Sequence, residues 1–275
     1  MQELRDFAGS VSIVVSSCDR FFDAWRPFAF FFRKFWPDCP FAVHLITNEL
    51  GVRSDFIRPL AVGPDRGWAS NMQTALSRIE TPYVLYFQED YFLTAPVDEA
   101  QLASDFRFAV ENDAAAFCFY DLSLLEPEFG LASERFRLVP EDSKGRTRLQ
   151  TTLWKRDALA SLLVPGENAW HMEARGSERT RGLRIFSYTR NADAPIPYLM
   201  SGIVRGLWTP EALALCRAHR FHIRPKFRST LALTKAGRRW GRALGRVRYP
   251  WARLLQGSRP VGLDEKDIRG EFLPR

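Results

Sequence analysis

Short apolar runs alternate with longer amphipathic stretches through most of the chain. Runs of about four to eight β-branched and aromatic residues are typical of buried strands, and stretches of helical length with an apolar face are typical of helices that cover a sheet. Glycine, proline, asparagine and aspartate separate the runs. The pattern predicts strands over Val11–Ser17, Phe41–Asn48, Phe56–Val62, Tyr83–Phe87, Ala115–Leu122, Leu183–Thr189 and Pro195–Val204.

Helical stretches lie between these strands. Helix start signals mark two of them: Ser70 or Asn71 as a cap, and Thr209 followed by a proline and an acid. The predicted helices cover Asp23–Trp36, Ser70–Ile79 and Gln101–Asp113, with a strand that turns into a helix near Asp157 and a further helix from Thr209. Strands that alternate with helices predict an α/β fold, in which a sheet is layered between helices.

Polar residues follow three of the predicted strands. Gln88, Glu89 and Asp90 come directly after the buried run Tyr83–Phe87, although charged side chains are costly to bury without a partner. Ser16 to Arg20 and Asn48–Glu49 follow two other strands. Because ligands of open α/β sheets bind at the carboxyl ends of the strands, we expect these three strand ends to meet in one cleft.

The positive charge of the chain is concentrated near its end. The formal net charge is +7, yet 13 lysines and arginines and no acid lie between Ala212 and Leu263. The rest of the chain is therefore mildly acidic. This distribution predicts a body with a strongly basic carboxy-terminal arm.

The cysteines, the first residues and the lack of a long apolar stretch together indicate a cytoplasmic location. The four cysteines form no CxxC or Cys/His pattern, so neither a disulfide framework nor a zinc site is indicated. The first ten residues lack the basic start and apolar run of a signal peptide. No apolar stretch reaches the roughly 20 residues of a membrane span. We expect a cytoplasmic protein, either free or peripheral at the inner face of the plasma membrane.

Five stretches, taken in order, resemble a known family. They are VSIVVSSCDR, DRGWASNMQTAL, TPYVLYFQEDYFL, LQTTLWKRDALASLL and AWHMEARGSE. Their order is similar to that of the GT-A-fold nucleotide-sugar glycosyltransferases, and is closest to the family-2-like enzymes of bacterial surface polysaccharide synthesis. The resemblance implies a GT-A-like, Rossmann-type mixed sheet flanked by helices as a catalytic domain over residues 1–211. It leaves the basic arm, expected to be helical, over residues 212–275.

The resemblance also implies an activity and a donor site. Such enzymes move a sugar from a nucleotide-diphosphate donor to a saccharide or a lipid-linked acceptor, here with inversion. The end of the first strand, Ser16, Ser17, Cys18 and Asp19, then contacts the nucleotide base. The loop that enters the next helix, Arg66, Gly67 and Trp68 with Asn71, matches the stretch that contacts the nucleotide or its sugar.

The metal motif of the family is altered here. Its D-x-D acids hold Mg²⁺ or Mn²⁺ on the diphosphate, whereas this chain has Gln88, Glu89 and Asp90. Side chains alternate on a strand, so Gln88 and Asp90 would share a face and Glu89 would point away. Asp90 is the metal candidate, because hard cations prefer carboxylate oxygens, and Gln88 and Glu89 are candidate substrate contacts. Metal dependence stays open, as does a purely structural role in which Glu89 and Asp90 cap a turn or pair with an arginine.

Inverting transfer needs a general base, because the acceptor hydroxyl loses a proton as it attacks. By resemblance, the base is an acid that opens a helix downstream of the TTLWKRDAL stretch. Glu173 is the first candidate and Glu178 the second, with His171 ranked below them because nothing fixes a partner for it. Trp170 could stack on the apolar face of a sugar or belong to the core. No Ser/His/Asp order, P-loop or GxGxxG appears, so hydrolases and kinases are not indicated.

The basic arm admits three interpretations. It is a solvated helical arm folded on the body, a surface for an anionic membrane, or, with less weight, a surface for nucleic-acid phosphates. The last two carry a second hypothesis for the whole protein. In that hypothesis the chain is a non-catalytic nucleic-acid or anionic-surface binder whose α/β body is a scaffold.

Overall fold

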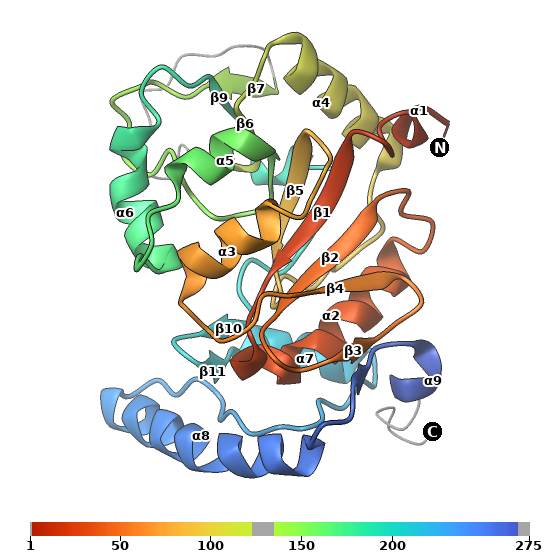
Figure 1. Cartoon of the computed structure of the whole chain (residues 1–275), viewed down its shortest axis with the longest axis vertical. Coiled ribbons are helices and arrows are strands. Elements are labelled where there is room, and N and C mark those ends of the chain that lie inside the picture. Colours follow the sequence, from red (N-terminus) through yellow and green to blue (C-terminus); the bar gives the residue numbers. More distant parts are fainter. Residues whose placement is uncertain (1, 123–134, 269–275) are drawn as a thin grey trace.

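A mixed eight-stranded sheet forms the centre of the molecule (Figure 1). The computed structural model describes residues 2–122 and 135–268. The strand order is β4-β2-β1-β5-β8-β6-β9-β7, and β8 and β7 run antiparallel to their neighbours. The strands are β1 (Val11–Ser16), β2 (Ala42–Thr47), β4 (Ile57–Ala61), β5 (Tyr83–Gln88), β6 (Ala116–Asp121), β7 (Phe136–Leu138), β8 (Thr152–Lys155) and β9 (Ile185–Tyr188).

Helices cover both faces of this sheet. The first face packs on α2 (Phe22–Phe35), α4 (Glu99–Glu111) and α7 (Pro210–Ala218), and the second packs on α3 (Trp68–Leu76), α5 (Arg156–Leu162) and α6 (Ala169–Arg179). Each face of the sheet has its own hydrophobic core. Successive side chains of β1 pack into alternate cores: Ile13 and Val15 lie in the core of the first face, and Val14 lies in the core of the second. This double burial explains why β1 is almost continuously apolar. The expectation of a mixed α/β sheet flanked by helices is confirmed.

Smaller elements complete the described fold. Two short pairs lie outside the main sheet: β10 (Ile203–Val204) with β11 (Leu207–Trp208), and β3 (Val52–Arg53) with β12 (Val261–Gly262). The remaining helices are α1 (Gln2–Arg5), α8 (Lys235–Gln256) and α9 (Glu265–Ile268), with 3₁₀ turns at Asp19–Phe21 and Asn191–Asp193.

Two of the predicted elements were placed wrongly. The helix α3 begins at Trp68 rather than at Ser70 or Asn71, and Gly67 precedes it without a side-chain cap. The strand predicted over Pro195–Val204 is wrong apart from β10 and one isolated bridge between Tyr198 and Leu93. Pro195 and Pro197 lack the amide proton that a strand ladder requires, which explains why the segment does not extend the sheet.

The carboxy-terminal segment returns to the body at several points. Arg228 Nε donates to Asp23 Oδ1 at 3.0 Å, where both side chains are buried. Phe221 stacks on Phe30, and Phe227 on Phe22. The helix α8 crosses the end of the molecule below β10 and β11 (Figure 1), and Gly241 packs it against Leu207. Within the described residues, no helix is both long and apolar enough to cross a membrane. The boundary at residue 211 stays a prediction, and residues 269–275 lie outside the described residues.

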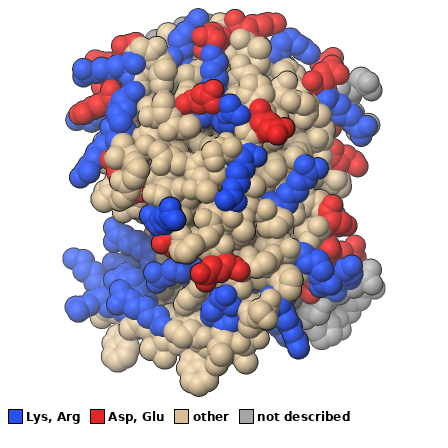
Figure 2. All heavy atoms as spheres, viewed as in Figure 1, with Lys and Arg blue, Asp and Glu red and all other residues tan. Residues whose placement is uncertain are grey.

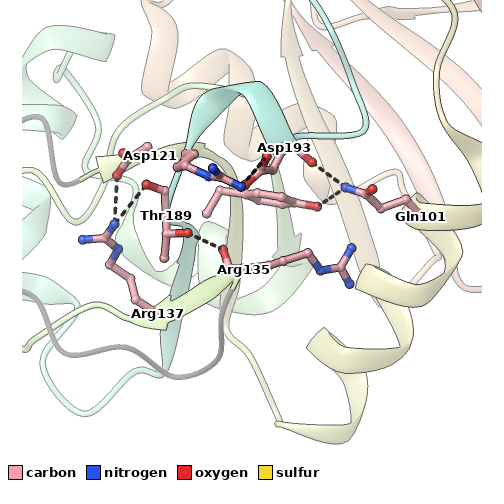
Figure 3. Close-up of polar contacts among 8 residues, drawn as sticks. Gln101, Asp121, Arg135, Arg137, Thr189 and Asp193 are labelled. Carbon is pink, nitrogen blue, oxygen red and sulfur yellow. Dashed lines mark hydrogen bonds and ion pairs between the residues drawn. The ribbon is translucent and has the colours of Figure 1, made fainter.

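A polar network fastens the ends of β6 and β9 (Figure 3). Arg137 Nη2 donates to Asp121 Oδ1 at 3.4 Å and to the Thr189 carbonyl at 3.3 Å. Gln101, on α4, donates to the Asp193 carbonyl, which ties the helix to the turn after β9. These contacts join β6, β7 and α4 to the segment after β9 at the outer part of the sheet.

Candidate functional site

A cavity of about 570 Å³ lies at the carboxyl ends of β1 and β5. These strands are parallel neighbours, with Ser16 opposite Gln88, so their polar ends meet as the sequence predicted. The third predicted strand end does not reach the cavity, because the amides of Asn48 and Glu49 are bonded to Asp19 instead. The sequence candidates that line the cavity are Ser16, Ser17, Cys18, Asn71, Gln88, Glu89, Asp90, Trp170 and Glu173.

Gln88, Glu89 and Asp90 all line this cavity. The strand ends at Gln88 and a turn follows, so the alternation expected of a strand does not extend to Glu89 and Asp90. Gln88 Nε2 donates to the Leu149 carbonyl at 3.2 Å. Asp90 Oδ2 accepts from the Ile203 amide at 2.7 Å, and Asp90 Oδ1 is buried without a hydrogen-bond partner among the described residues.

Two neighbouring acids give this part of the cavity an unusual electrostatic character. Burial raises the pKa of Asp90 to about 6. Burial, and then the nearby Asp90 carboxylate, raise the pKa of Glu89 well above its ordinary value. Neither acid forms an ion pair within the described residues, so the proposed pairing with an arginine does not occur there. A bound cation or a proton stabilises buried carboxylates of this kind.

Two indole groups fix the hydroxyls at the end of β1. Trp68 Nε1 donates to Ser16 Oγ at 2.9 Å, and Trp25 Nε1 donates to Ser17 Oγ at 2.8 Å. Burial raises the pKa of the Cys18 thiol to about 12, so Cys18 contributes a neutral side chain to the wall. The thiol is therefore no nucleophile at neutral pH.

Asp19 does not make the contact with the nucleotide base that the resemblance implied for it, because its carboxylate is bonded within the protein. Its carboxylate accepts the backbone amides of Asn48, Glu49 and Leu50 at 2.8–2.9 Å. Asp19 is not among the residues that line the cavity. Three amide donors bind this one carboxylate, and these hydrogen bonds fix the turn after β2 against the end of β1.

The loop before α3 is held by its own side chains. Asp65 Oδ1 accepts from Gly67 N at 3.0 Å and from Asn71 Nδ2 at 2.9 Å, while Asn71 Oδ1 accepts from Arg66 N at 3.2 Å. Gly67 has a φ of +89°, a conformation that glycine adopts readily. Asp65, Gly67 and Asn71 face the cavity, whereas the Arg66 side chain is exposed and outside it.

The helix α6 brings the candidate base to the opposite wall. Asn168 caps it by accepting from His171 N at 2.9 Å. Glu173 Oε1 accepts from Leu149 N at 2.9 Å, and Glu173 Oε2 lies 3.9 Å from Arg148 Nη1. The carboxylate is thus oriented by one backbone donor, and Glu173 lines the cavity.

Three further candidates lie around Glu173. Trp170 is 67% exposed, so it is no core residue, and its indole lies at the cavity lining. His171 is exposed and does not line the cavity. Glu178 is exposed and lines a second cavity of about 730 Å³, which shares Arg148, Trp170 and Glu173 with the first. Glu173 therefore stands between two recesses.

Several lining residues escaped sequence reasoning. Arg148, Gln150 and Arg205 face the cavity, as do Asp65 and Tyr91. Arg205 has a φ of +52° in the segment that Asp90 holds at Gly202 and Ile203. Nothing local in the sequence marks Arg148 or Arg205, because folding brings their segments to β5 from more than fifty residues away.

The described residues contain no group of three or more His, Cys, Asp or Glu side chains that could hold a metal ion. Glu89 and Asp90 nevertheless provide two adjacent carboxylates, and one Asp90 oxygen is without a partner among the described residues. Carboxylate oxygens suit Mg²⁺ or Mn²⁺ when water and phosphate complete the shell. The two carboxylates therefore fit Mg²⁺ or Mn²⁺ as part of a ligand set that other oxygen ligands would complete.

No protein-family model matches this chain, and no curated protein matches it by sequence. A fragment of S. aureus TarS is 12% identical and covers 69% of this chain and 59% of its own, with a TM-score of 0.42. TarS structures include complexes with UDP-GlcNAc and with UDP.

Two other solved structures are comparable. The CMP:2-keto-3-deoxy-manno-octonic acid synthetase complexed with CTP is 11% identical over 76% of this chain and 98% of its own, with a TM-score of 0.42. A cytidylyltransferase from Leptospira borgpetersenii is 10% identical over 70% of this chain and 82% of its own, with a TM-score of 0.43. Identities and TM-scores this low describe a loose likeness, and no function follows from it.

Proposed function

We propose that the protein transfers a sugar from a nucleotide-diphosphate donor to a saccharide or lipid-linked acceptor hydroxyl, with inversion at the sugar carbon. The observation that carries this proposal is one cavity at the carboxyl ends of β1 and β5 that contains both the Glu89–Asp90 pair and Glu173. A paired acidic locus suits a metal-bound diphosphate, and a separate carboxylate suits an attacking hydroxyl.

The donor is assigned to the β1 and β5 side of the cavity. Ser16, Ser17 and Cys18 form the wall for the nucleoside, and the diphosphate lies toward Glu89 and Asp90. Mg²⁺ or Mn²⁺, when bound by these acids, would neutralise charge on the leaving diphosphate. Arg148 and Arg205 face the same space and supply positive charge from the protein itself.

The acceptor is assigned to the second cavity, on the other side of Glu173. That cavity is lined by acids and bases of α6 and of residues 141–148, with Trp170 at the junction. Polar side chains beside an exposed indole suit a saccharide, whose hydroxyls form hydrogen bonds and whose ring face is apolar. An acceptor placed there would present its hydroxyl to Glu173.

In the transfer step Glu173 acts as the general base. The acceptor oxygen forms a bond to the anomeric carbon while its proton passes to the Glu173 carboxylate. The bond from that carbon to the diphosphate oxygen breaks, and its electron pair leaves with the nucleoside diphosphate. The hydrogen bond from Leu149 N to Glu173 Oε1 orients the base for this transfer.

The non-catalytic hypothesis rests on the basic arm alone. It offers no reason for a cavity that holds two acids of raised pKa beside a third oriented acid. Unpartnered buried acids are costly, and such groups cluster at functional sites. The site therefore favours an enzyme.

Ligand binding tests this assignment. Thermal stability is measured with a panel of nucleoside diphosphates and nucleotide sugars, with and without Mn²⁺. One nucleotide sugar is expected to stabilise the protein. Trp170 lines the donor cavity as well as the second cavity, so its indole also faces the sugar of the donor. Trp170→Ala should therefore weaken binding of that nucleotide sugar more than binding of its nucleoside diphosphate, whereas Trp240→Ala, at a similarly exposed tryptophan on α8, should change neither. The proposal is wrong if the protein is folded and none of these nucleotides raises its thermal stability.

A further inference from the structure

An exposed apolar stripe runs along one side of α8. Trp240, Leu244, Val247, Trp251 and Leu254 recur every three or four residues, so they share one face of the helix. Their exposed fractions run from 41% for Leu244 to 71% for Trp240, and the neighbouring Leu255 is 85% exposed. Large side chains scattered singly over a surface need no explanation, whereas a contiguous stripe of this kind marks an interaction surface.

The opposite side of the same helix attaches it to the body. Gly241 and Ala252 are buried, and a Cβ at Gly241 would lie 3.0 Å from Leu207 Cδ2. Tyr249 packs edge-on against Phe22 and Phe227. The orientation of α8 is therefore fixed by packing, and its apolar stripe faces outward because the other face is occupied.

Basic side chains flank the stripe. The helix carries seven lysines and arginines and no acid. Lys235, Arg239, Arg246 and Arg248 are exposed, and none of the basic side chains of α8 forms an ion pair with a residue in the described ranges 2–122 and 135–268. Figure 2 shows positive side chains gathered over α8, with uncharged side chains projecting from the lower edge beneath them.

A basic recess continues this surface toward the candidate site. It measures about 370 Å³ and is lined by Arg20, Arg205, Arg242, Arg246 and Tyr249. Arg205 and Gly206 line both this recess and the cavity of the candidate site. Positive charge at this density suits phosphate groups rather than a neutral surface.

We propose that α8 is a docking surface for an anionic phospholipid bilayer, with its apolar stripe inserted among the lipids and its arginines at the phosphates. A helix with aromatic and aliphatic residues on one face and Lys or Arg beside them lies in the membrane interface in this way. Docking on α8 places the basic recess, and through it the edge of the candidate cavity, at the bilayer surface.

The charge of α8 argues against two other occupants. A second copy of the chain would bring two sets of unpaired arginines together, and like charges oppose that contact. Nucleic acid would satisfy the arginines, but a duplex offers the aliphatic side chains Leu244, Val247 and Leu254 no apolar partner. An anionic bilayer supplies both kinds of contact.

Vesicle binding tests this proposal with the full chain and needs no donor or acceptor, so its failure is distinct from failure of the proposed transferase. Binding is measured by sedimentation with vesicles of phosphatidylcholine alone and with vesicles of equal parts phosphatidylcholine and phosphatidylglycerol. We expect binding to the anionic vesicles only. High salt should weaken it, because the screening length shortens from about 10 Å at 0.1 M to about 3 Å at 1 M.

Two pairs of variants separate insertion from charge. Trp240→Ser with Trp251→Ser should lower vesicle binding about tenfold or more, through loss of apolar burial. Arg239→Glu with Arg248→Glu should lower it about 25-fold or more, since each surface-facing arginine contributes about fivefold. All four side chains are exposed, so the fold should be unchanged.

Matched controls lie away from α8. Val110→Ser with Leu138→Ser removes exposed apolar side chains, and Arg5→Glu with Arg58→Glu makes the same change in net charge. Both controls should bind vesicles as the wild type does.

Four results would overturn the proposal. The first is that the wild-type protein does not bind anionic vesicles at low salt, and the second is that the controls lose as much vesicle binding as the α8 variants. The third is tight binding to polynucleotide without binding to vesicles. The fourth is that the protein is a dimer which the tryptophan substitutions dissociate.

Discussion

Glu173 is the residue on which the chemistry depends. Glu173→Gln keeps the size of the side chain and an oxygen that can accept from Leu149 N, but an amide cannot take the acceptor's proton. Transfer should fall roughly 10²–10⁴-fold while donor affinity stays unchanged. Glu178→Gln, at an exposed acid on the same helix that lines only the second cavity, is the control and should keep most activity. Equal losses in the two variants would contradict the assignment of the base.

Asp90 links stability to pH. Its pKa rises from 3.8 to about 6 on folding, so between these values the folded state keeps a proton that the unfolded state has lost. The free energy of unfolding therefore falls as the pH rises through this range. Asp90→Asn removes this titration, together with the part of the rise in the Glu89 pKa that the Asp90 charge causes. The free energy of unfolding of the variant should therefore fall by about 1–2 kcal/mol less than that of the wild type over this pH interval.

Chemical denaturation at a series of pH values measures this difference. Asp23 and Asp105 also have pKa values of about 6, but they titrate in both proteins and so cancel in the comparison. The variant should be at least as stable as the wild type at neutral pH and should lose any response of donor binding to Mn²⁺. If the free energy of unfolding changes with pH in the same way in the two proteins, this account of Asp90 is wrong.

At the scale of elements, Gly176 sets how closely α6 approaches the segment that orients Glu173. A Cβ there would lie 2.7 Å from Thr147 Oγ1 and 3.0 Å from Met172 Sδ. Gly176→Ala should therefore move α6 away from residues 147–149, cost about 1–3 kcal/mol of stability, and lower turnover more than donor affinity. Gly9→Ala, where nothing lies within 4 Å, is the control. Full turnover in a destabilised Gly176→Ala protein would show that this contact does not position the base.

Sequence periodicity predicted most elements of the sheet, because strands such as β1 and β5 are buried on both sides and carry long apolar runs. It also predicted the meeting of two strand ends, which follows from the parallel order of β1 and β5. The helix of Glu173 was predicted from the family resemblance and not from periodicity. Periodicity could not predict that the Asp19 carboxylate accepts hydrogen bonds from the backbone amides after β2, since those donors are about thirty residues away in the chain. Arg148 and Arg205 were missed for the same reason, as long-range packing alone brings them to the site.

At the scale of the whole molecule, a buried ion pair between Arg228 and Asp23 joins the carboxy-terminal segment to α2. Asp23 is fully buried, and its pKa is about 6 because burial outweighs the lowering effect of Arg228. Arg228→Ala should cost about 3–5 kcal/mol, since it leaves this acid unpaired. Lys226→Ala, at an exposed neighbour, should cost almost nothing. Urea denaturation measures both, and similar midpoints would contradict a structural role for the pair.

Truncation after Leu215 follows the same reasoning. It removes Phe221, Phe227 and Arg228, and with them the partners of Phe30, Phe22 and Asp23. The shortened chain should unfold at a much lower temperature than the full chain, or fail to fold. A shortened chain as stable as the full one would favour an independent arm from residue 212, as the sequence predicted. Point variants on α8 are therefore the better means of testing that surface.

Identification of the leaving group tests the central claim most directly. The wild-type protein is incubated with the nucleotide sugar that stabilises it and with a saccharide acceptor, and the products are separated and examined by NMR. We predict release of a nucleoside diphosphate in equal amount with a glycoside of inverted anomeric configuration. Release of pyrophosphate from a nucleoside triphosphate, or a glycoside of retained configuration, would contradict the account.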